Sequence, residues 1–394
     1  MKNLILTVVV LIIAMTSKSQ WTSLTPLSSG EWLTDLYFVD NNTGFAIGEN
    51  GKIIKTTNGG LTWVSQNSGT SNGLASVFFT DATHGYAVGG ASTLTKTADG
   101  GNTWTVTSFT SPFNLVDVFF PSSNTGYFVE THSQIIKTVD GGTNWAYKNS
   151  GSGLGAIASI HFPTDNIGYT VGGLGNIYKT IDGGTNLTTL TSGTTEDLKS
   201  CFFIDTQTGW ASGKNGTIIK TIDGGATWVS LSSGTTVTLN SIFFATASNG
   251  WAVGENGVIV NTMDGGTTWT IQNSGTTESL SEAYFTNSNN GYAVGTNGTI
   301  LKMSIAPAEL PNDLVMTDDQ IVLYPNPTHG IYNLSSKTPF TNISVYSMVG
   351  EQILSIESKS NKMKIDLTNK AKGQYIVKAI LQDKSVQTKL IEIQ

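Results

Sequence analysis

The chain has 394 residues, with 21 lysines and 28 acidic residues, and only 12% of its residues are charged, giving a formal net charge of −7. It contains no arginine, and residues 20–303 carry 10 lysines against 19 acidic residues, so this segment is a poor electrostatic match for nucleic acid or an anionic membrane. The single cysteine, Cys201, excludes an intrachain disulfide. A chain of this length can bury enough apolar surface to be stable without one.

The N-terminal segment has the pattern of a secretory signal peptide. Lys2 precedes an apolar run over residues 4–14, and small residues follow it around Ser17. The apolar run is too short to span a bilayer as a helix. We expect residues 1–19 to be removed, so that the mature chain begins at Gln20.

Residues 20–303 contain seven copies of one repeat. A pair with an aromatic member recurs every 41 or 42 residues, from Tyr37-Phe38 to Tyr284-Phe285, and a Gly–aromatic pair follows each copy. Each copy divides into four short segments rich in β-branched and aromatic residues, which in the second copy are residues 74–80, 86–88, 94–97 and 103–107. Four antiparallel strands per repeat of this length predict an all-β fold, a seven-bladed β-propeller.

The two ends of the repeat series predict how the ring closes. The seventh copy stops at Met303, after its third strand, and the missing fourth strand lies at the other end of the chain, around Trp21. Trp21 precedes Trp63 by 42 residues, in phase with the series. We therefore expect the N-terminal strand to pair into the last blade and to leave no open sheet edge.

A short motif with the pattern Thr-x-Asp-Gly-Gly-x-Thr-Trp follows the third strand in six of the copies. Its acidic position is occupied by Asn58, Asp99, Asp140, Asp182, Asp223 and Asp264. We expect each carboxylate to accept hydrogen bonds from the amides of its own turn, while the two glycines adopt positive φ. A motif repeated almost unchanged in successive blades suits the blade rather than a ligand. Calcium binding is the alternative, although these turns lack the denser carboxylate spacing of calcium loops.

These motifs resemble the Asp boxes of sialidases, sortilins and certain glycoside hydrolases. Residues 21–303 as a whole resemble the propellers of photosystem II assembly factors and their non-photosynthetic bacterial relatives. Sialidases clamp a substrate carboxylate with arginines, which lysine does not replace, so the absence of arginine excludes sialidase activity. The partner surface proposed for the photosystem assembly factors is arginine-rich, so the analogy with them does not extend to that surface.

Strand order assigns the loops of the predicted propeller to two faces. The loops after strands one and three, with the Asp boxes, lie on one face, and the loops after strands two and four lie on the other, where propellers usually bind ligands. On this second face we place His132, Lys214 and a possible binding set: Glu31, Trp32, Glu49, Phe113, Glu130, Glu196, Asp197, Glu255 and Glu278. The set is either a solvated rim or a shallow acidic surface for neutral glycans, cations or basic peptides, with Trp32 and Phe113 as apolar anchors.

No residue pattern specifies a catalytic site, a metal site or a cofactor. Cys201 occupies a core column of the repeat and His161 an aromatic column, so neither predicts a nucleophile or a zinc ligand. We expect a non-catalytic binding or scaffold protein. The alternative is a glycoside hydrolase acting on extracellular polysaccharide, which needs two facing carboxylates, one with a raised pKa. The acidic candidates for it are Asp35, Asp117, Glu196, Asp197 and Glu282.

After the repeats, residues 304–320 have the proline and acid content of a linker, and lysine becomes common beyond them. Residues 321–394 alternate as strands and predict a small β-sandwich. The expected strands are residues 331–334, 343–346, 352–356, 363–367, 374–380 and 389–393.

The motifs of this segment resemble the type A sorting domain of the type IX secretion system. They are Tyr-Pro-Asn-Pro at residues 324–327, Val-Tyr-Ser-Met-Val-Gly at 345–350 and Ala-Lys-Gly-Gln-Tyr-Ile-Val at 371–377, with Ser347 where the family usually has Asp. The resemblance implies Sec export, recognition of residues 321–394 by the secretion machinery and its sortase, and either release or attachment to lipopolysaccharide. We therefore expect a secreted or outer-membrane surface protein whose further partner is an extracellular glycan or protein.

Overall fold

The computed structural model describes the chain except for residues 1–18, 25–29, 108, 110, 133, 149–154, 306–320, 325–329, 348–351 and 394. The chain divides into two compact units, Met1–Ala308 and Glu309–Gln394. The predicted signal peptide up to residue 18 and the predicted linker beyond residue 305 lie outside the described residues. Within the residues that the structure describes, no helix is long and apolar enough to cross a membrane.

The first unit consists of seven four-stranded antiparallel sheets, one for each predicted repeat. Blades 1 to 3 are β2 (Leu33–Phe38), β3 (Gly44–Gly48), β4 (Ile53–Thr56) and β5 (Val64–Gln66); β6 (Leu74–Phe79), β7 (Gly85–Gly89), β8 (Leu94–Thr97) and β9 (Thr105–Thr107); and β10 (Leu115–Phe119), β11 (Gly126–Glu130), β12 (Ile135–Thr138) and β13 (Ala146–Lys148).

Blades 4 to 7 have the same order. They are β14 (Ile157–His161), β15 (Gly168–Gly172), β16 (Ile177–Thr180) and β17 (Thr188–Leu190); β18 (Leu198–Phe203), β19 (Gly209–Gly213), β20 (Thr217–Thr221) and β21 (Val229–Ser232); β22 (Leu239–Phe244), β23 (Gly250–Gly254), β24 (Ile259–Thr262) and β25 (Thr270–Gln272); and β26 (Leu280–Asn287), β27 (Asn290–Gly295), β28 (Ile300–Ile305) and β1 (Ser19–Ser23).

Among the described residues, short 3-10 turns join the second and third strands of blades 1, 2, 4, 5, 6 and 7. They are η1 (Glu49–Gly51), η2 (Gly90–Ser92), η3 (Gly173–Gly175), η4 (Lys214–Gly216), η5 (Glu255–Gly257) and η6 (Thr296–Gly298).

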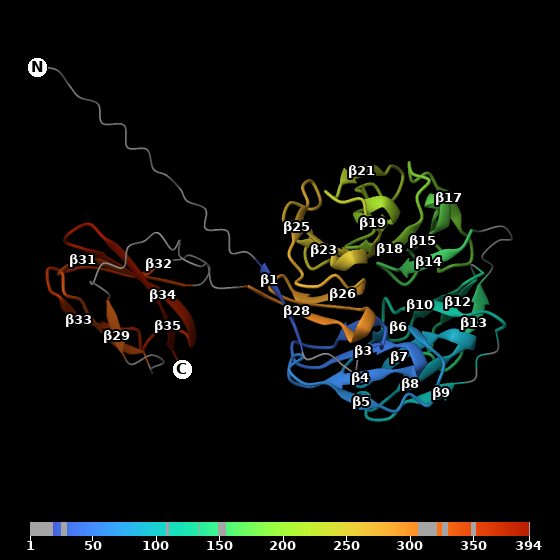
Figure 1. The fold of residues 1–394 in the computed structure, drawn as a ribbon, viewed down its shortest axis with the longest axis horizontal. Coiled ribbons are helices and arrows are strands. Elements are labelled where there is room, and N and C mark those ends of the chain that lie inside the picture. Colours follow the sequence, from blue (N-terminus) through green and yellow to red (C-terminus); the bar gives the residue numbers. More distant parts are fainter. Residues whose placement is uncertain are drawn as a thin grey trace, which may run out of the picture. The chain divides into compact units, whose positions relative to one another are not determined.

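Each blade packs against its neighbours on both faces. Figure 1 shows β5, β9, β13, β17, β21 and β25 at the periphery of the ring, with β6, β10, β14, β18 and β26 around its centre. Phe45 and Ile47 of blade 1 form one buried cluster with Val77 and Phe79 of blade 2. Because both faces are covered, the second strand of a blade is buried at every position, as in β3 and β7.

The N-terminal strand closes the ring, as the sequence predicts. β1 pairs antiparallel with β28, and Trp21 lies opposite Met303. The Trp21 side chain is only 4% exposed, its Nε1 donates to Gln272 Oε1 at 2.8 Å, and its ring lies edge-on to that of Phe285. β28 continues to Ile305, two residues past the predicted end of the propeller.

Hydrogen bonds join successive blades beside the axis. Every inner strand carries a β-bulge near its start, and in several blades the N–H group after the bulge donates to a side chain of the preceding blade. Val77 N donates to Asp35 Oδ2 at 2.7 Å, and Ile160 N donates to Asp117 Oδ2 at 2.8 Å. The hydroxyls that accept in the same way belong to Ser76, Ser200 and Ser241.

Two residues after these acceptor positions, each inner strand carries an aromatic side chain, and the seven aromatic side chains form a closed ring. Centroids of neighbouring rings lie 4.4–5.2 Å apart all the way round, through Tyr37, Phe78, Phe119, His161, Phe202, Phe243 and Tyr284. Burial lowers the pKa of His161 to about 3, so its imidazole is neutral at physiological pH. Cys201 is likewise a buried core residue, with 5% of its surface exposed.

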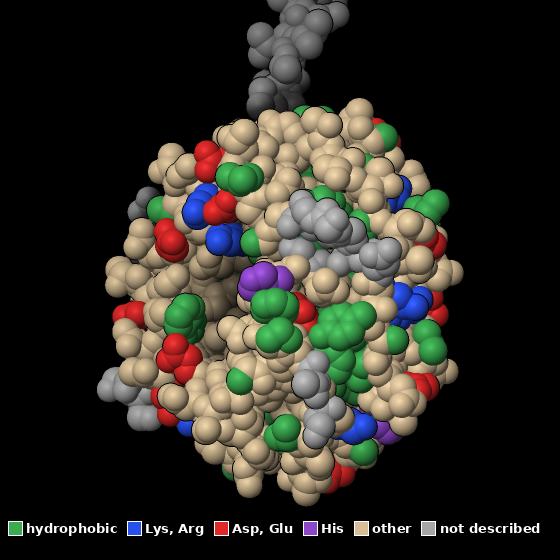
Figure 2. Space-filling view, turned by 90° about the vertical axis from the view of Figure 1, so that its right-hand side faces the viewer, with side chains coloured by type: hydrophobic (Ala, Val, Ile, Leu, Met, Phe, Trp, Pro, Cys, Tyr) green, Lys and Arg blue, Asp and Glu red, His purple; other side chains and the backbone are tan. Residues whose placement is uncertain are grey.

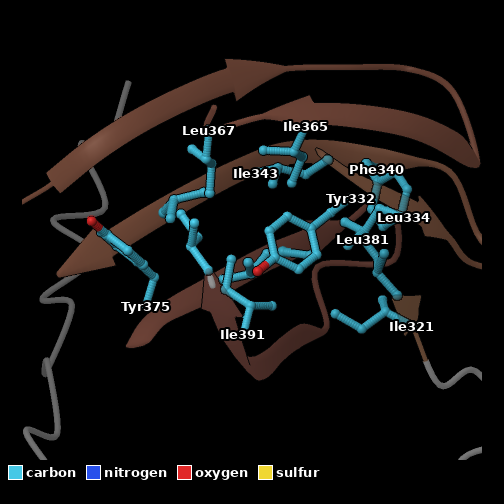
Figure 3. Close-up of a cluster of buried hydrophobic side chains, with 14 residues drawn as sticks. Ile321, Tyr332, Leu334, Phe340, Ile343, Ile365, Leu367, Tyr375, Leu381 and Ile391 are labelled. Carbon is cyan, nitrogen blue, oxygen red and sulfur yellow. The ribbon is translucent and has the colours of Figure 1, made fainter. Parts of the chain in front are cut away.

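The second unit is the predicted β-sandwich. One sheet is β29-β30-β33 and the other is β32-β31-β34-β35. The strands are β29 (Val322–Tyr324), β30 (Ile331–Ser335), β31 (Phe340–Ser347), β32 (Gln352–Glu357), β33 (Lys362–Asp366), β34 (Gly373–Leu381) and β35 (Val386–Ile393). Side chains of both sheets meet in one core, with Tyr332 between Ile343 and Ile391 (Figure 3). β29 was not predicted from the sequence, because three consecutive apolar or aromatic residues show no alternation, although in the structure Leu323 packs against the core while Val322 and Tyr324 are exposed.

Candidate ligand-binding site

Each Asp box holds its own turn together. In blade 5, Asp223 Oδ1 accepts hydrogen bonds from Thr221 Oγ1 at 2.8 Å and Thr227 N at 2.9 Å, and Oδ2 accepts from Thr227 Oγ1 at 2.6 Å. The Thr227 hydroxyl contributes most to lowering the pKa of Asp223 to about 2. Asn58 keeps the arrangement with an amide, whose Nδ2 donates to Thr62. The equivalent carboxylates are those of Asp99, Asp140, Asp182 and Asp264.

Several boxes also bond their blade to the one before it. Lys220 Nζ and Trp210 Nε1 of blade 5 donate to Gly265 O in the box of blade 6, at 2.8 and 3.1 Å. The lysines that make the equivalent bond elsewhere are Lys55, Lys179 and Lys302.

Blade 7 has no box, because its outer strand comes from the N-terminus. In blade 6 the lysine position holds Asn261, which donates within its own blade, and Trp251 Nε1 has no partner within the described residues.

The opposite face carries the predicted binding residues, and the ring gathers most of them on one half. Blades 5, 6, 7 and 1 are consecutive, and their loops contribute Glu196, Asp197, Glu255, Glu278, Glu31 and Glu49. The equivalent positions of blades 2 to 4, all described, hold no acidic residue. We call these six acidic residues together with Trp32 the acidic crescent.

Trp32 is the apolar member of the acidic crescent. Its side chain is 45% exposed, and Nε1 donates to Ser281 Oγ of blade 7 at 2.8 Å. Its carbonyl oxygen accepts from Glu49 N at 3.1 Å. These bonds hold the indole at the junction of blades 1 and 7, with nearly half of its surface free to contact a ligand.

The crescent keeps a negative charge because only two of its carboxylates have a lysine partner. Lys52 pairs with Glu31 at 2.8 Å, and Lys214 pairs with Asp197 at 2.6 Å. The Lys214 hydrogen bond is the largest cause that lowers the pKa of Asp197. Glu49 and Glu255 are exposed and have no side-chain partner among the described residues.

Two predicted members lie elsewhere. Glu130 is 0% exposed, with Oε1 accepting from Tyr147 Oη at 3.0 Å and Oε2 unpartnered within the described residues, so its predicted place on the surface is wrong. It ends β11, where the other blades have glycine; at Gly48 a Cβ would lie 2.1 Å from Trp32 O. Phe113 is in blade 3, outside the crescent, and stacks on His132 with centroids 3.8 Å apart.

On the side drawn in Figure 2, no apolar patch extends over a large part of the surface. Hydrophobic side chains form small separate groups there, and charged side chains are scattered among uncharged polar atoms. Small groups of this kind are ordinary on a soluble surface.

Three further acidic side chains lie on inner strands beside the axis: Asp35, Asp117 and Glu282. Each of these side chains is half-buried: part of it is accessible to solvent, and protein groups surround the carboxyl. Burial raises the pKa of Asp35 to about 7 and that of Asp117 to about 6, and it raises the pKa of Glu282 well above its usual value. The charge of Asp35 adds to the shift of Glu282. Of the five hydrolase candidates, Asp35 and Glu282 lie on adjacent inner strands, whereas Glu196 and Asp197 lie in the crescent.

In the part of the chain that the structure describes, no group of three or more His, Cys, Asp or Glu side chains is arranged to hold a metal ion.

A closed ring of seven blades with Asp-box turns, followed by a separate sandwich, defines an Asp-box β-propeller with an appended C-terminal domain. Residues 322–394 match the model of the secretion system C-terminal sorting domain. Residues 190–273 and 233–304 match the model of the photosynthesis system II assembly factor YCF48. Residues 190–304 are therefore similar to YCF48, and residues 322–394 are similar to the Por secretion system C-terminal sorting domain. The sorting domain implies interaction with the type IX secretion machinery and a secreted or cell-surface location.

Solved structures share the fold at low sequence identity. YCF48 bound to D1 peptide is 20% identical, with a TM-score of 0.62 over 73% of this chain and 97% of that one. YCF48 from Cyanidioschyzon merolae is 20% identical, with a TM-score of 0.62 over 72% and 99%. The WD40 β-propeller domain of Doa1 is 10% identical, with a TM-score of 0.62 over 75% and 100%. No curated protein sequence matches the chain.

The axial carboxyls predict that stability falls as pH rises through the weakly acidic range. The pKa of Asp35 is raised from 3.8 to about 7, so between these values the folded chain holds a proton that the unfolded chain has lost. One such group lowers the free energy of unfolding by at most about 1.4 kcal/mol per pH unit. Denaturant midpoints from pH 4 to pH 8 should therefore fall, and Asp35→Asn and Asp117→Asn should flatten the fall.

Asp223→Asn is the matched control for this experiment. Its carboxyl has a lowered pKa, so its contribution is lost only as pH falls below about 4, and the decline from pH 4 to pH 8 should remain. A wild-type midpoint that rises over this range would show that the axial groups are ionised in the folded chain.

Proposed function

We propose that the chain is an exported, non-catalytic binding propeller that holds a basic peptide segment of a protein partner on the acidic crescent. The observation that carries the proposal is the grouping of the exposed carboxylates of Glu49 and Glu255, neither of which forms an ion pair among the described residues, with the exposed indole of Trp32 on one half of the ring. An acidic surface attracts segments rich in lysine and arginine and speeds their association. A half-exposed tryptophan is a frequent anchor at protein interfaces.

The fold relatives support a peptide as the ligand class. One solved structure with this fold is YCF48 bound to D1 peptide. We extend only the ligand class to this chain, because the two proteins share 20% of their residues. The nature of the peptide follows from the charge of the acidic crescent and not from that relative.

The absence of catalysis is part of the same proposal. Asp35 and Asp117 accept hydrogen bonds from backbone N–H groups of the following blades, and Glu282 accepts from Ser241 Oγ and Ala283 N. We infer that these carboxyls stabilise the ring.

A glycoside hydrolase remains the second candidate, because Asp35 and Glu282 are neighbouring carboxyls and a general acid needs a raised pKa, although the pair also needs one ionised carboxylate. Release of reducing sugar from a polysaccharide, abolished by Glu282→Gln, would favour it.

Peptide selection tests the binding proposal. A bead library of random peptides, incubated with the labelled protein, should be enriched in sequences rich in lysine and arginine. Trp32→Ala should weaken binding of an enriched peptide about tenfold or more, because it removes the anchor. Fluorescence polarisation measures the affinity, which should also fall as salt is added.

The matched control is Ile222→Ala, which removes a side chain that is 71% exposed on the Asp-box face. It should leave the affinity unchanged. Enrichment of acidic peptides, or equal binding by the Trp32→Ala and Ile222→Ala proteins, would contradict the proposal.

For the second unit we propose the whole route that the sorting domain suggests: Sec export, passage across the outer membrane, removal of residues 321–394 by the sortase, and release or attachment to lipopolysaccharide. The propeller and the sandwich have separate cores, so each can fold without the other. A chain without residues 321–394 should therefore fold but remain in the periplasm, as cell fractionation can show.

Residues 304–394, fused to an unrelated exported domain, should carry that domain to the cell surface. Surface delivery of the truncated propeller, or a fusion that stays in the periplasm, would speak against this route.

A further inference from the structure

An open cavity of about 670 Å³ lies on the Asp-box face, between blades 2 and 3. The loop between β6 and β7 supplies Asp81 and His84 to its wall, β8 supplies Lys96, and the boxes of the two blades supply Asp99 and Asp140. A cavity of this size suits a ligand of a few hundred daltons. It lies on the face opposite the acidic crescent, so it cannot be part of that site.

Lys96 behaves differently from its equivalents in the other blades. Lys55, Lys179, Lys220 and Lys302 donate to a box carbonyl of the next blade at 2.7–2.8 Å. These four and Lys137 also lie over an aromatic ring, with Nζ 5.1–5.7 Å from its centroid. Lys96 makes neither contact among the described residues, and it lines the cavity instead.

Occupation of the box carbonyl by another donor does not explain this difference. Tyr86 Oη donates to Gly141 O, the acceptor that Lys96 would use, at 2.7 Å. In blade 4, however, Tyr169 Oη and Lys179 Nζ share Gly224 O. A tyrosine therefore does not displace the lysine, and the free ammonium group of Lys96 is a particular property of this cavity.

His84 is the second departure from the repeat at this place. The other blades have Thr, Ile or Asn before the Gly–aromatic pair, and only blade 2 has histidine. His84 Nδ1 is 2.9 Å from Asp81 Oδ2, and this contact orients the ring. Nε2 has no partner among the described residues and remains available to a ligand.

The charges around the cavity limit what it can bind. The carboxylates of Asp99 and Asp140 are ionised but committed to their own turns, and hydrogen bonds lower the pKa of each to about 2. The three aspartates repel an anion, and a cation offers no acceptor to the free N–H groups of Lys96. A neutral ligand with many hydroxyl groups avoids both penalties. Its hydroxyls can accept from Lys96 and can donate to His84 Nε2, which is an acceptor in the neutral ring because Nδ1–H faces Asp81, or to a carboxylate oxygen.

We propose that this cavity is a second binding site, and that it takes a short neutral oligosaccharide. Lys96 donates to ring or hydroxyl oxygens of the sugar, and the His84–Asp81 pair fixes a further hydroxyl. The lysine position therefore has two uses in one chain. In blades 1, 4, 5 and 7 it bonds to the next blade, and in blade 2 it is left for a ligand.

Calorimetric titration of the intact protein tests the site with defined probes: maltotriose, cellotriose, mannotriose and, as an anionic comparison, sialyllactose. At least one neutral trisaccharide should bind. Lys96→Ala and His84→Ala should each raise its Kd about tenfold or more. Lys96→Ala should leave the melting temperature unchanged, because the Lys96 side chain makes no hydrogen bond or ion pair among the described residues.

Lys220→Ala is the matched control. It removes the bond to Gly265 O and should lower the melting temperature by a few degrees while leaving the sugar Kd unchanged. Trp32→Ala should also leave the sugar Kd unchanged, which separates this site from the acidic crescent. The proposal is overturned if the folded protein binds no neutral trisaccharide at millimolar concentration, if sialyllactose binds more tightly, or if Lys96→Ala binds as wild type does.

Discussion

The blades of this protein can cover their apolar faces only if the ring is complete. Blade 1 packs Phe45 and Ile47 against blade 2, and the last blade completes its own sheet with Trp21 from the other end of the chain. Without β1, β28 would be an open edge that invites pairing with another chain. The hydrogen bonds beside the axis, the lysine bonds to the boxes and the two loop faces all require this closure.

Seven similar copies are needed to close the ring, so specific function must lie where the copies differ. Some differences have a structural reason. Asn261 stands where the following blade has no box for a lysine to reach. Others have none in the ring: the acidic loops belong to four consecutive blades, and the Lys96 ammonium group donates to no box carbonyl among the described residues. These last two differences mark the two surfaces for which we propose ligands.

The repeat period was enough to predict the blades and their number, because most strand pairing within a blade is local in sequence. The closing strand pairs the two ends of the series, and it was predicted from the missing fourth strand of the seventh copy and the phase of Trp21. The grouping of acids in blades 5, 6, 7 and 1 also follows from blade order, once blade 7 is placed beside blade 1. Glu130 could have been recognised as unusual, since it stands in a column of glycines. Its burial, the raised pKa of Asp35 and the cavity beside Lys96 depend on contacts between blades, which the period does not describe.

Hydrogen exchange of β28 tests the closure most directly. In the chain that begins at Gln20, the amides of Ile300–Ile305 should be protected about as well as those of β24, the equivalent strand of blade 6. In a chain that begins at Gly30, they should exchange at least about tenfold faster, while the amides of β12 on the far side of the ring keep their protection. Full protection of β28 in the shortened chain would contradict the account, since the ring would then be complete without the N-terminal strand.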